Sequence, residues 1–459
     1  MHTYSATDLV IAMLLLYLPC AHFPLPRFIR TTIIGVPTWG SGNETAWSAT
    51  AFFAPETVVV FLLGLMILSK RSLMLPTLPR GYWPLIWASC MILCGGAISL
   101  MASPFPGISM AGLAGRLTVF FLAIVISVSA PSRGAIRLWT YATLAGTSLM
   151  CAAGLYYFVQ AFGFPANLST LPLLRVSPGI ADYQRATYGL ASNTVDLLVL
   201  TASTAVALCM VKGVSRLGRV FLITATLLMY ANLLVSFQRW AWICLALAFA
   251  LTILYYRRRK SRYALLGVVA AALLLFGTTA FTQLGGYFQE ATDPTSGSNI
   301  TARLRDWQEG LSILFSNPAG LGFGTAGTLA DLSDTSSHNL FIDIGVEGGV
   351  LALMGTVVWA VYHLRLTVGL ILRAETDSEW SFALLLGAFT FVVYGIFFNS
   401  LLYFSGLMVW LALWWLYPVM ASAIFTAPVN HAAPNSSVQL RNRTRTATPP
   451  DPYPAVFGS

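Results

Sequence analysis

The sequence predicts an all-α polytopic membrane protein with about twelve transmembrane helices. Of its 459 residues, 57% are hydrophobic and only 9% are charged, and the mean hydropathy is +0.72. A soluble globular domain carries roughly 25% charged residues, so this composition excludes one. Several long segments also contain no Lys, Arg or Asp, as expected of helices that cross about 30 Å of hydrocarbon.

The predicted spans follow one another along nearly the whole chain. Each is an apolar run of about 12 to 20 residues, completed by flanking residues where the run is short. The first has no basic segment before it and no cleavage site, so we expect a retained helix rather than a signal peptide. The spans are expected at about 8–23, 50–68, 82–102, 117–130, 138–160, 194–211, 220–237, 241–256, 263–282, 340–363, 381–397 and 403–424.

The distribution of Lys and Arg predicts the orientation of these spans. Basic residues gather in alternate connections, for example Lys70-Arg71 and Arg257-Arg258-Arg259-Lys260, and the positive-inside rule assigns those connections to the cytoplasm. Both termini are then cytoplasmic. Residues 1–427 form a single transmembrane domain with outer loops at about 161–193 and 283–339, and residues 428–459 have the composition of a disordered cytoplasmic tail.

Two common functional classes receive no support from the composition. The net charge of +9 reflects topology and membrane anchoring, because no nucleic-acid-binding motif accompanies it. All six cysteines lie within apolar runs, and Cys90 and Cys94, one helical turn apart, have no His or carboxylate near them. Small buried hydrophobic residues are the simpler interpretation, so we expect no metal and no cofactor.

The basic residues that this topology places on the outer face are all arginines. The planar guanidinium binds phosphate or carboxylate through paired hydrogen bonds and keeps its charge at physiological pH, which suits oxyanion recognition. The alternative for each arginine is a side chain that extends from a helix end to the interface. The outer arginines are Arg27, Arg30, Arg116, Arg175, Arg185, Arg239, Arg303 and Arg305.

Arg239 and Arg185 are the strongest candidates outside the long polar stretch. Arg239 lies in Phe237-Gln238-Arg239-Trp240, a connection with almost no loop. Its guanidinium is therefore held at the outer membrane boundary, where the positive-inside rule disfavours a cation. Arg185 lies in the outer loop at about 161–193, just before the span that begins near Asn193.

A polar stretch from about Gly285 to Ser337 interrupts the apolar chain and is the best candidate for chemistry. Arg303 and Arg305 open a predicted amphipathic helix that ends at Asn317-Pro318 and is suited to lie along the membrane surface. The glycine run that follows is expected to be a flexible turn rather than a phosphate-binding loop, because no strand precedes it. The apolar residues of the helix are Leu304, Trp307, Leu311, Ile313 and Leu314.

His338 directly follows this stretch and is the candidate base. An imidazole, with a pKa of about 6.5, accepts a proton from a hydroxyl near neutral pH, whereas arginine does not. The alternative is a histidine that caps a helix beside Ser336 and Ser337. Just inside the next span, Asp343 and Glu347 lie one turn apart on the same face, and ion pairs with an outer arginine would satisfy these carboxylates.

Short motifs follow one another in a fixed order in the second half of the chain. Arg303-x-x-x-Trp307 precedes Pro318-x-Gly-x-Gly, then Ser337-His338-Asn339, then Val346-Glu347-x-Gly349. This order resembles the signature of the O-antigen ligase and O-antigen polymerase superfamily. Arg185 and Arg239 are similar to further arginine positions of that family, and one departure is Gln238, where a small Ser or Gly is more usual.

The resemblance implies a GT-C-like, metal-independent glycosyltransferase of the bacterial inner membrane with its site on the periplasmic face. Its donor would be a glycan on undecaprenyl diphosphate. Preorganised arginines would stabilise the charge that develops on the diphosphate, and His338 would activate the acceptor hydroxyl. On that chemistry we expect catalysis by His338, Arg239 and Arg303, substrate binding by Arg185 and Arg305, and supporting contacts from Asp343 and Glu347.

Three functions remain open at this point. Ligation of the glycan to a lipid A core hydroxyl is the first, and polymerisation of lipid-linked repeats by the same chemistry is the second. The third is a transporter or flippase for a lipid-linked sugar, which predicts charged or helix-breaking residues at mid-membrane in several spans. Such residues are sparse in this sequence, so the enzyme is favoured.

Overall fold

A computed structural model of the chain describes residues 4–20, 83–110, 112–114, 116–117, 132–162, 195–236, 239–257, 299–325, 339–373 and 379–397. All of them belong to one unit of the chain, Met1–Phe425. The spans predicted at 50–68, 263–282 and 403–424, nearly all of the span at 117–130, and the tail at 428–459 lie outside the described residues. His338 and Arg185 lie outside them as well.

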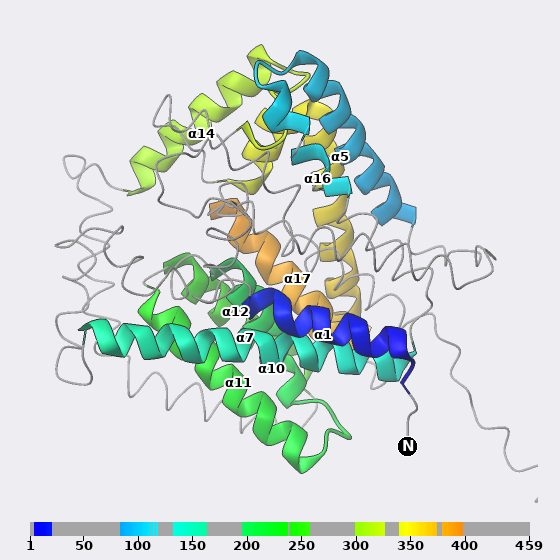
Figure 1. Cartoon of the computed structure of the whole chain (residues 1–459), viewed down its shortest axis with the longest axis vertical. Helices are drawn as coiled ribbons and strands as arrows, with labels where there is room; N and C mark the ends of the chain where they lie inside the picture. Colours follow the sequence, from blue (N-terminus) through cyan, green and yellow to red (C-terminus); the bar gives the residue numbers. More distant parts are fainter. Residues whose placement is uncertain are drawn as a thin grey trace, which may run out of the picture. The chain divides into compact units, whose positions relative to one another are not determined.

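Every regular element among the described residues is helical (Figure 1). This agrees with the predicted all-α class for that part of the chain. Residues 106–110, 112–114 and 116–117 are helical as well. The longer helices are α1 (Ala6–Cys20), α5 (Trp83–Ala102), α7 (Arg133–Phe162), α10 (Val195–Cys209), α11 (Arg216–Val235), α12 (Arg239–Tyr255), α14 (Asn299–Ser316), α16 (Leu340–Arg373) and α17 (Glu379–Phe397).

Four of these helices are long and apolar enough to cross a membrane, within Trp83–Ala102, Arg133–Gln160, Leu340–Leu372 and Glu379–Ile396. Each predicted span that lies within the described residues coincides with a helix. α16 continues about ten residues beyond its predicted end at 363, since helical hydrogen bonding does not stop where an apolar run stops. The chain is therefore a membrane protein with several membrane-length helices.

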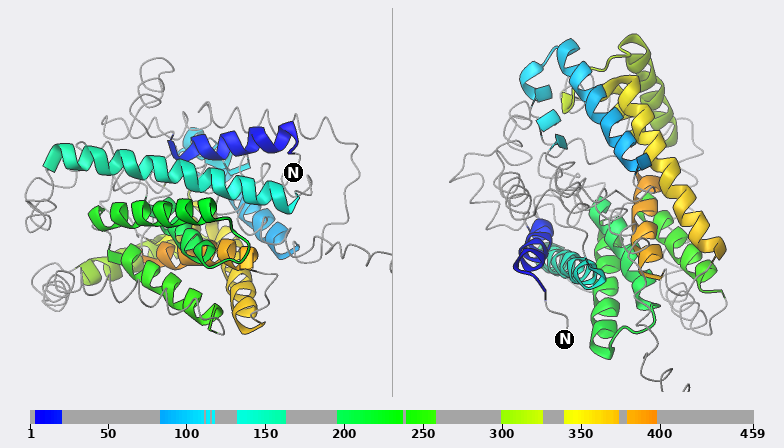
Figure 2. Two further views of the ribbon diagram at one scale, coloured as in Figure 1. Left: turned by 90° about the horizontal axis from the view of Figure 1, so that it is seen from below. Right: turned by 90° about the vertical axis from the view of Figure 1, so that its right-hand side faces the viewer.

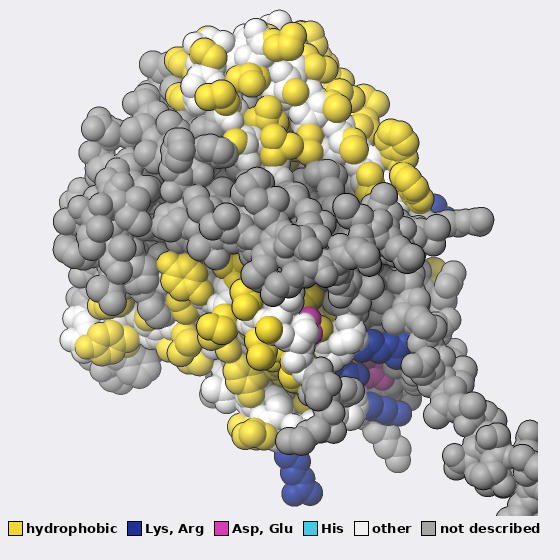
Figure 3. Space-filling view, turned by 45° about the vertical axis from the view of Figure 1, so that its right-hand side comes forward, with side chains coloured by type: hydrophobic (Ala, Val, Ile, Leu, Met, Phe, Trp, Pro, Cys, Tyr) yellow, Lys and Arg dark blue, Asp and Glu magenta, His cyan; other side chains and the backbone are white. Residues whose placement is uncertain are grey.

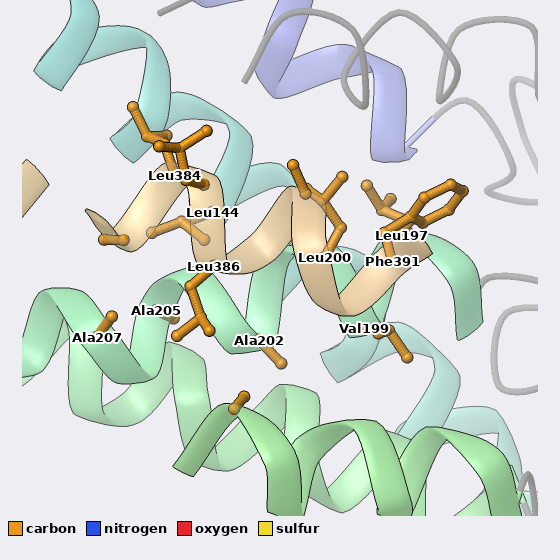
Figure 4. Packing of buried hydrophobic residues seen from close by; sticks show 14 of the residues in the cluster. Leu144, Leu197, Val199, Leu200, Ala202, Ala205, Ala207, Leu384, Leu386 and Phe391 are labelled. Carbon is orange, nitrogen blue, oxygen red and sulfur yellow. The ribbon is translucent and has the colours of Figure 1, made fainter. Parts of the chain in front are cut away.

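α10 and α17 pack against each other at the centre of the largest buried cluster. Figure 4 shows part of this cluster, with Leu384, Leu386 and Phe391 labelled among residues that include Leu200. The helices approach closely at Gly387, where an added Cβ would lie 2.5 Å from the carbonyl oxygen of Leu200. Small residues allow such an approach, and van der Waals packing then replaces the hydrophobic drive that is absent between helices in lipid.

α5 and α16 form a second close pair, seen side by side in Figure 2. A Cβ added at Gly95 of α5 would lie 2.5 Å from the carbonyl oxygen of Gly348. A Cβ added at Gly355 of α16 would lie 2.6 Å from the carbonyl oxygen of Ala88. The two helix backbones are thus in contact at two levels, and this contact holds the first half of α16 in place.

Hydrophobic side chains cover much of the described surface. On the face shown in Figure 3 they make up most of it, and Lys and Arg are few. Met101 is 86% exposed and Leu217 is 81% exposed. Apolar surface on this scale is unfavourable in water and is expected where helices face lipid.

Candidate functional site

α14 carries Arg303 and Arg305 and packs against the first turns of α16. Its inward side is formed by Leu314, which is 2% exposed, with Trp307 and Ile313 beside it. These residues contact a buried cluster that includes Ile342 and Val346 of α16. The predicted helix and its end before Asn317-Pro318 are confirmed.

The apolar residues predicted for this helix divide between two sides. Trp307, Ile313 and Leu314 face α16, whereas Leu304 and Leu311 are exposed. Leu304, Leu311 and Phe315 are spaced at i, i+7 and i+11 and therefore form a stripe along the outward side. An exposed apolar stripe fits a helix at a lipid surface.

The contacts advance along α14 and α16 in the same direction. A Cβ added at Gly345 would lie 3.0 Å from Leu314, and the N–H of Val350 donates to the carbonyl of Pro318 at 3.0 Å. The first turns of α14, which carry Arg303, therefore extend toward the side from which the chain enters α16. The chain enters α16 at Asn339, the residue after His338.

The glycine turn, defined here as Pro318 to Gly324, is bound to the backbone of α16. The N–H of Leu321 donates to the carbonyl of Val346 at 2.9 Å, and the N–H of Gly322 donates to the carbonyl of Glu347 at 2.8 Å. The N–H of Gly324 donates to the Glu347 Oε1 atom at 2.9 Å. These donors are directed at α16, which argues against a loop that binds phosphate through its backbone.

Left-handed backbone explains why glycines recur in this turn. Gly320, Gly322 and Gly324 have φ angles of 86°, 107° and 85°. On the facing helix, Gly349 has φ 75° and ψ −177°, which kinks α16. Residues with a Cβ rarely adopt these angles, so glycine is required on both sides of the contact. The predicted turn is present, and its hydrogen bonds to α16 fix its course.

Phe323 anchors the glycine turn in the protein interior. Its side chain is fully buried and lies among glycines of three separate segments. A Cβ added at Gly96 would overlap the Phe323 ring, and one added at Gly348 would lie 2.8 Å from it. A Cβ added at Gly112 would lie 2.5 Å from the Phe323 carbonyl oxygen. The ring therefore fills a space that only residues without side chains leave open.

A buried ion pair between Arg116 and Glu347 lies next to Phe323. The Nη2 atom of Arg116 lies 2.8 Å from the Oε2 atom of Glu347, and the two side chains are 9% and 0% exposed. Nη1 of Arg116 donates to the carbonyl of Gly112 at 3.3 Å, and the guanidinium lies 3.8 Å above the centre of the Phe323 ring. Glu347 thus has an arginine partner, as expected for a carboxylate in a membrane helix.

The start of α16 is fixed by Asn339. Its side-chain Oδ1 accepts hydrogen bonds from the N–H groups of Phe341 at 2.9 Å and Ile342 at 3.2 Å. This is the geometry of an N-cap residue. His338, the residue before the cap, lies outside the described residues. Asp343, on the first turn, is 4% exposed.

The remaining candidates are placed to different degrees. Arg239 is the first residue of α12, and its side chain lies outside the description. Arg303 is half-buried, whereas Arg305 on the same helix is exposed. The structure brings the helix of Arg303 and the helix of Glu347 together, and it leaves the distances from Arg185, Arg239 and His338 open.

The positions that hold this region together were not predicted from the sequence. Arg116 was grouped with arginines for oxyanion recognition, yet it is buried and paired with Glu347. Phe323 was counted only as part of a glycine run. The available signal was a single Arg beside an otherwise apolar run, but the sequence does not show which carboxylate it meets.

These features define a helical membrane protein in which α14, the glycine turn and α16 form one polar centre. Residues 224–357 match the family model for O-antigen ligase, and no curated protein matches the chain. The matched range contains Arg239, Arg303, His338 and Glu347. The match confirms the resemblance drawn from the motifs. The matched family consists of membrane enzymes that transfer glycans, and it implies lipid-linked glycan substrates.

Proposed function

We propose that the protein is a ligase-type glycosyltransferase that moves a glycan from undecaprenyl diphosphate to an acceptor hydroxyl of the lipid A core. The reaction takes place at the periplasmic face of a bacterial inner membrane and does not depend on a metal ion. The observation that carries the proposal is the match of residues 224–357 to the O-antigen ligase model. The motifs within that range are those from which the chemistry was inferred.

The packing of α14 on α16 supports this proposal. Trp307 contacts the cluster of Ile342 and Val346, four residues after Arg303. The cap at Asn339 fixes the chain directly after His338. A cation-bearing helix and the residue after the candidate base are thus held by one rigid element, as catalysis through fixed geometry requires.

The chemistry requires two functions from the protein. Transfer breaks the bond between the sugar and the diphosphate, so negative charge grows on the leaving group. Arg239 and Arg303 stabilise that charge in our proposal, with Arg185 and Arg305 holding the donor. His338 accepts the proton of the acceptor hydroxyl as the new glycosidic bond forms. Asp343 and Glu347 support the site.

The complete fold in this proposal is GT-C-like, with about twelve spans, a long periplasmic loop and both termini in the cytoplasm. The exposed stripe of Leu304, Leu311 and Phe315 supports a position of α14 along the outer membrane surface. A lipid-linked donor then reaches the arginines with its tail still in the bilayer. Labelling of Arg305→Cys by an impermeant thiol reagent, in a variant without the native cysteines, tests the predicted side of the membrane.

Reconstitution with a defined donor separates the possible functions. Purified protein receives undecaprenyl-diphosphate-linked glycan together with lipid A core, and the products are sized on a gel. One transfer for each lipid A core supports ligation. A ladder of lengthened lipid-linked glycan, formed without lipid A core, would instead identify a polymerase of the same family.

The His338→Ala variant is the matched control for this assay, because it alters the candidate base and leaves the apolar spans intact. It should insert normally and yield no product. If the wild type forms no glycosidic product but moves a labelled lipid-linked sugar across vesicles, the enzyme proposal is wrong and a transporter is indicated.

A further inference from the structure

Glu347 is the point at which three segments of the chain meet. Its Oε2 atom binds Arg116 at 2.8 Å, and its Oε1 atom accepts from the N–H of Gly324 at 2.9 Å. Its backbone carbonyl accepts from the N–H of Gly322 at 2.8 Å. One residue of α16 therefore holds both the glycine turn and Arg116, two positions before the kink at Gly349.

Arg116 also contacts the glycine turn, through Phe323. Its guanidinium lies over the ring of Phe323 while it pairs with Glu347 and donates to the carbonyl of Gly112. The residue is 8% exposed, and its nearest partners belong to the protein. This geometry suits a side chain that orders the site and does not suit one that grips a diphosphate.

The glycine turn is the direct connection between α14 and the interior. It begins two residues after α14 ends at Ser316, and its hydrogen bonds reach the backbone of α16 at Val346, Glu347 and Val350. A shift of the turn would therefore move the end of α14 along α16. Because α14 carries Arg303 and α16 begins at its cap residue Asn339, such a shift would change the distance between Arg303 and the start of α16.

We propose that Arg116 is a positioning residue for glycan transfer, and that its contacts with Glu347 and Phe323 fix the glycine turn and thereby the placement of Arg303 relative to the start of α16 at Asn339. The inference rests on the proposed function. A buried ion pair is a poor source of stability, because the desolvation of both charges offsets their attraction. The effect of this ion pair is instead to favour a single arrangement of the glycine turn.

A double-mutant cycle tests this inference. Arg116→Met and Glu347→Gln each remove one partner, and the third variant carries both changes. A misplacement of reacting groups by about 1 Å costs about 100-fold in rate, so each single variant should lose about that factor in kcat. The loss in the double variant should resemble that of one single variant, because both changes break the same contact.

The split between kcat and KM distinguishes positioning from direct binding. A positioning role predicts a fall in kcat while the KM for the lipid-linked donor changes by less than about threefold. Direct contact with the diphosphate predicts a rise in donor KM for Arg116→Met and no effect for Glu347→Gln. Losses that multiply in the double variant, or a selective effect on donor KM, would overturn the inference.

Hydrogen exchange provides a readout that does not depend on activity. In the wild type, peptides covering residues 318–325 should be protected, because the N–H groups of Leu321, Gly322 and Gly324 donate to α16. Arg116→Met should raise exchange there by at least about tenfold. Arg365→Met is the matched control, since Arg365 is exposed on the same helix as Glu347, and it should leave exchange and transfer unchanged.

The two measurements separate the possible failures. If the wild type shows no transfer with any acceptor, the proposed function is wrong, and exchange still decides whether Arg116 orders the glycine turn. If transfer is present and Arg116→Met leaves both exchange and kcat at wild-type values, the positioning role is wrong while the enzyme assignment stands.

Discussion

The indole N–H of Trp242 donates a hydrogen bond to the carbonyl of Leu233 at 3.0 Å. Leu233 lies in the last turn of α11, where carbonyls lack partners within the helix, and Trp242 lies in the first turn of α12. The hydroxyl of Ser236 donates to the same carbonyl at 2.7 Å. The bond from Trp242 thus joins the first turn of α12, which begins at Arg239, to the last turn of α11.

Trp242→Phe should weaken glycan transfer without preventing folding. The change removes the donor and keeps an aromatic ring, and Ser236 still satisfies the carbonyl. One hydrogen bond contributes about 1 kcal/mol, so we expect kcat/KM to fall about fivefold through a looser placement of Arg239. Trp87→Phe on α5 is the control, because Trp87 is 62% exposed. Equal activities of the two variants would show that the connection does not depend on this bond.

His338→Ala should abolish transfer in a correctly inserted protein. A general base contributes about 10² to 10⁴ in rate, and the cap that begins α16 belongs to the neighbouring Asn339. The initial rate with purified donor and acceptor is the measurement, and detergent gel filtration checks the fold. Asn339→Ala is the contrasting variant: it removes the cap, so it should lower the unfolding temperature, whereas His338→Ala should not. Full transfer by His338→Ala would exclude this residue as the base.

The helices were predictable because a membrane helix is specified locally. Apolar runs such as Trp83 to Ala102 have the length and composition that the bilayer requires, and the structure has helices there. The motif residues were predictable for a similar reason, since Arg303, His338 and Glu347 occur within short ordered motifs. These features are local in the sequence, so they can be recognised without knowledge of the tertiary contacts.

The tertiary partners were not predictable in the same way. Glu347 was expected to pair with one of the outer arginines, and Arg116 is one of them. The sequence did not indicate which of the eight it would be, because Arg116 and Glu347 lie 231 positions apart. That choice depends on how α5 packs against α16, through glycines whose close contacts appear only in three dimensions. The role of Phe323 has the same origin, because its space is formed by Gly96, Gly112 and Gly348 together.

Arg303 and Arg305 should respond differently to the same substitution. Arg303 is half-buried and Arg305 is exposed, so only the former has the restricted geometry that favours stabilisation of developing charge. We expect Arg303→Lys to lower kcat about 100-fold, because lysine lacks the planar fork. Arg305→Lys should mainly raise donor KM, by less than about tenfold, and the loss should grow with salt concentration. Steady-state kinetics over donor concentration make the comparison, and the reverse order of effects would exchange the two assignments.

Gly355 and Gly369 offer a matched test of the contact between α5 and α16. Both are glycines within α16. A Cβ at Gly355 would lie 2.6 Å from the carbonyl oxygen of Ala88, whereas a Cβ at Gly369 would meet nothing within 4 Å. Gly355→Ala should therefore destabilise the protein by about 1 to 3 kcal/mol through overpacking, and Gly369→Ala should be neutral or stabilising because alanine favours the helix.

Thermal unfolding in detergent measures this difference, with the two variants prepared in parallel. Because the backbone of α5 cannot move away from Gly355 without disturbing the contact of Gly95 with Gly348, we expect Gly355→Ala to reduce glycan transfer as well. In this variant α5 and α16 should move apart where α16 binds the glycine turn. Protection of residues 318–325 from hydrogen exchange should therefore fall as well. Similar unfolding temperatures for the two variants would mean that α5 and α16 are not held at this distance.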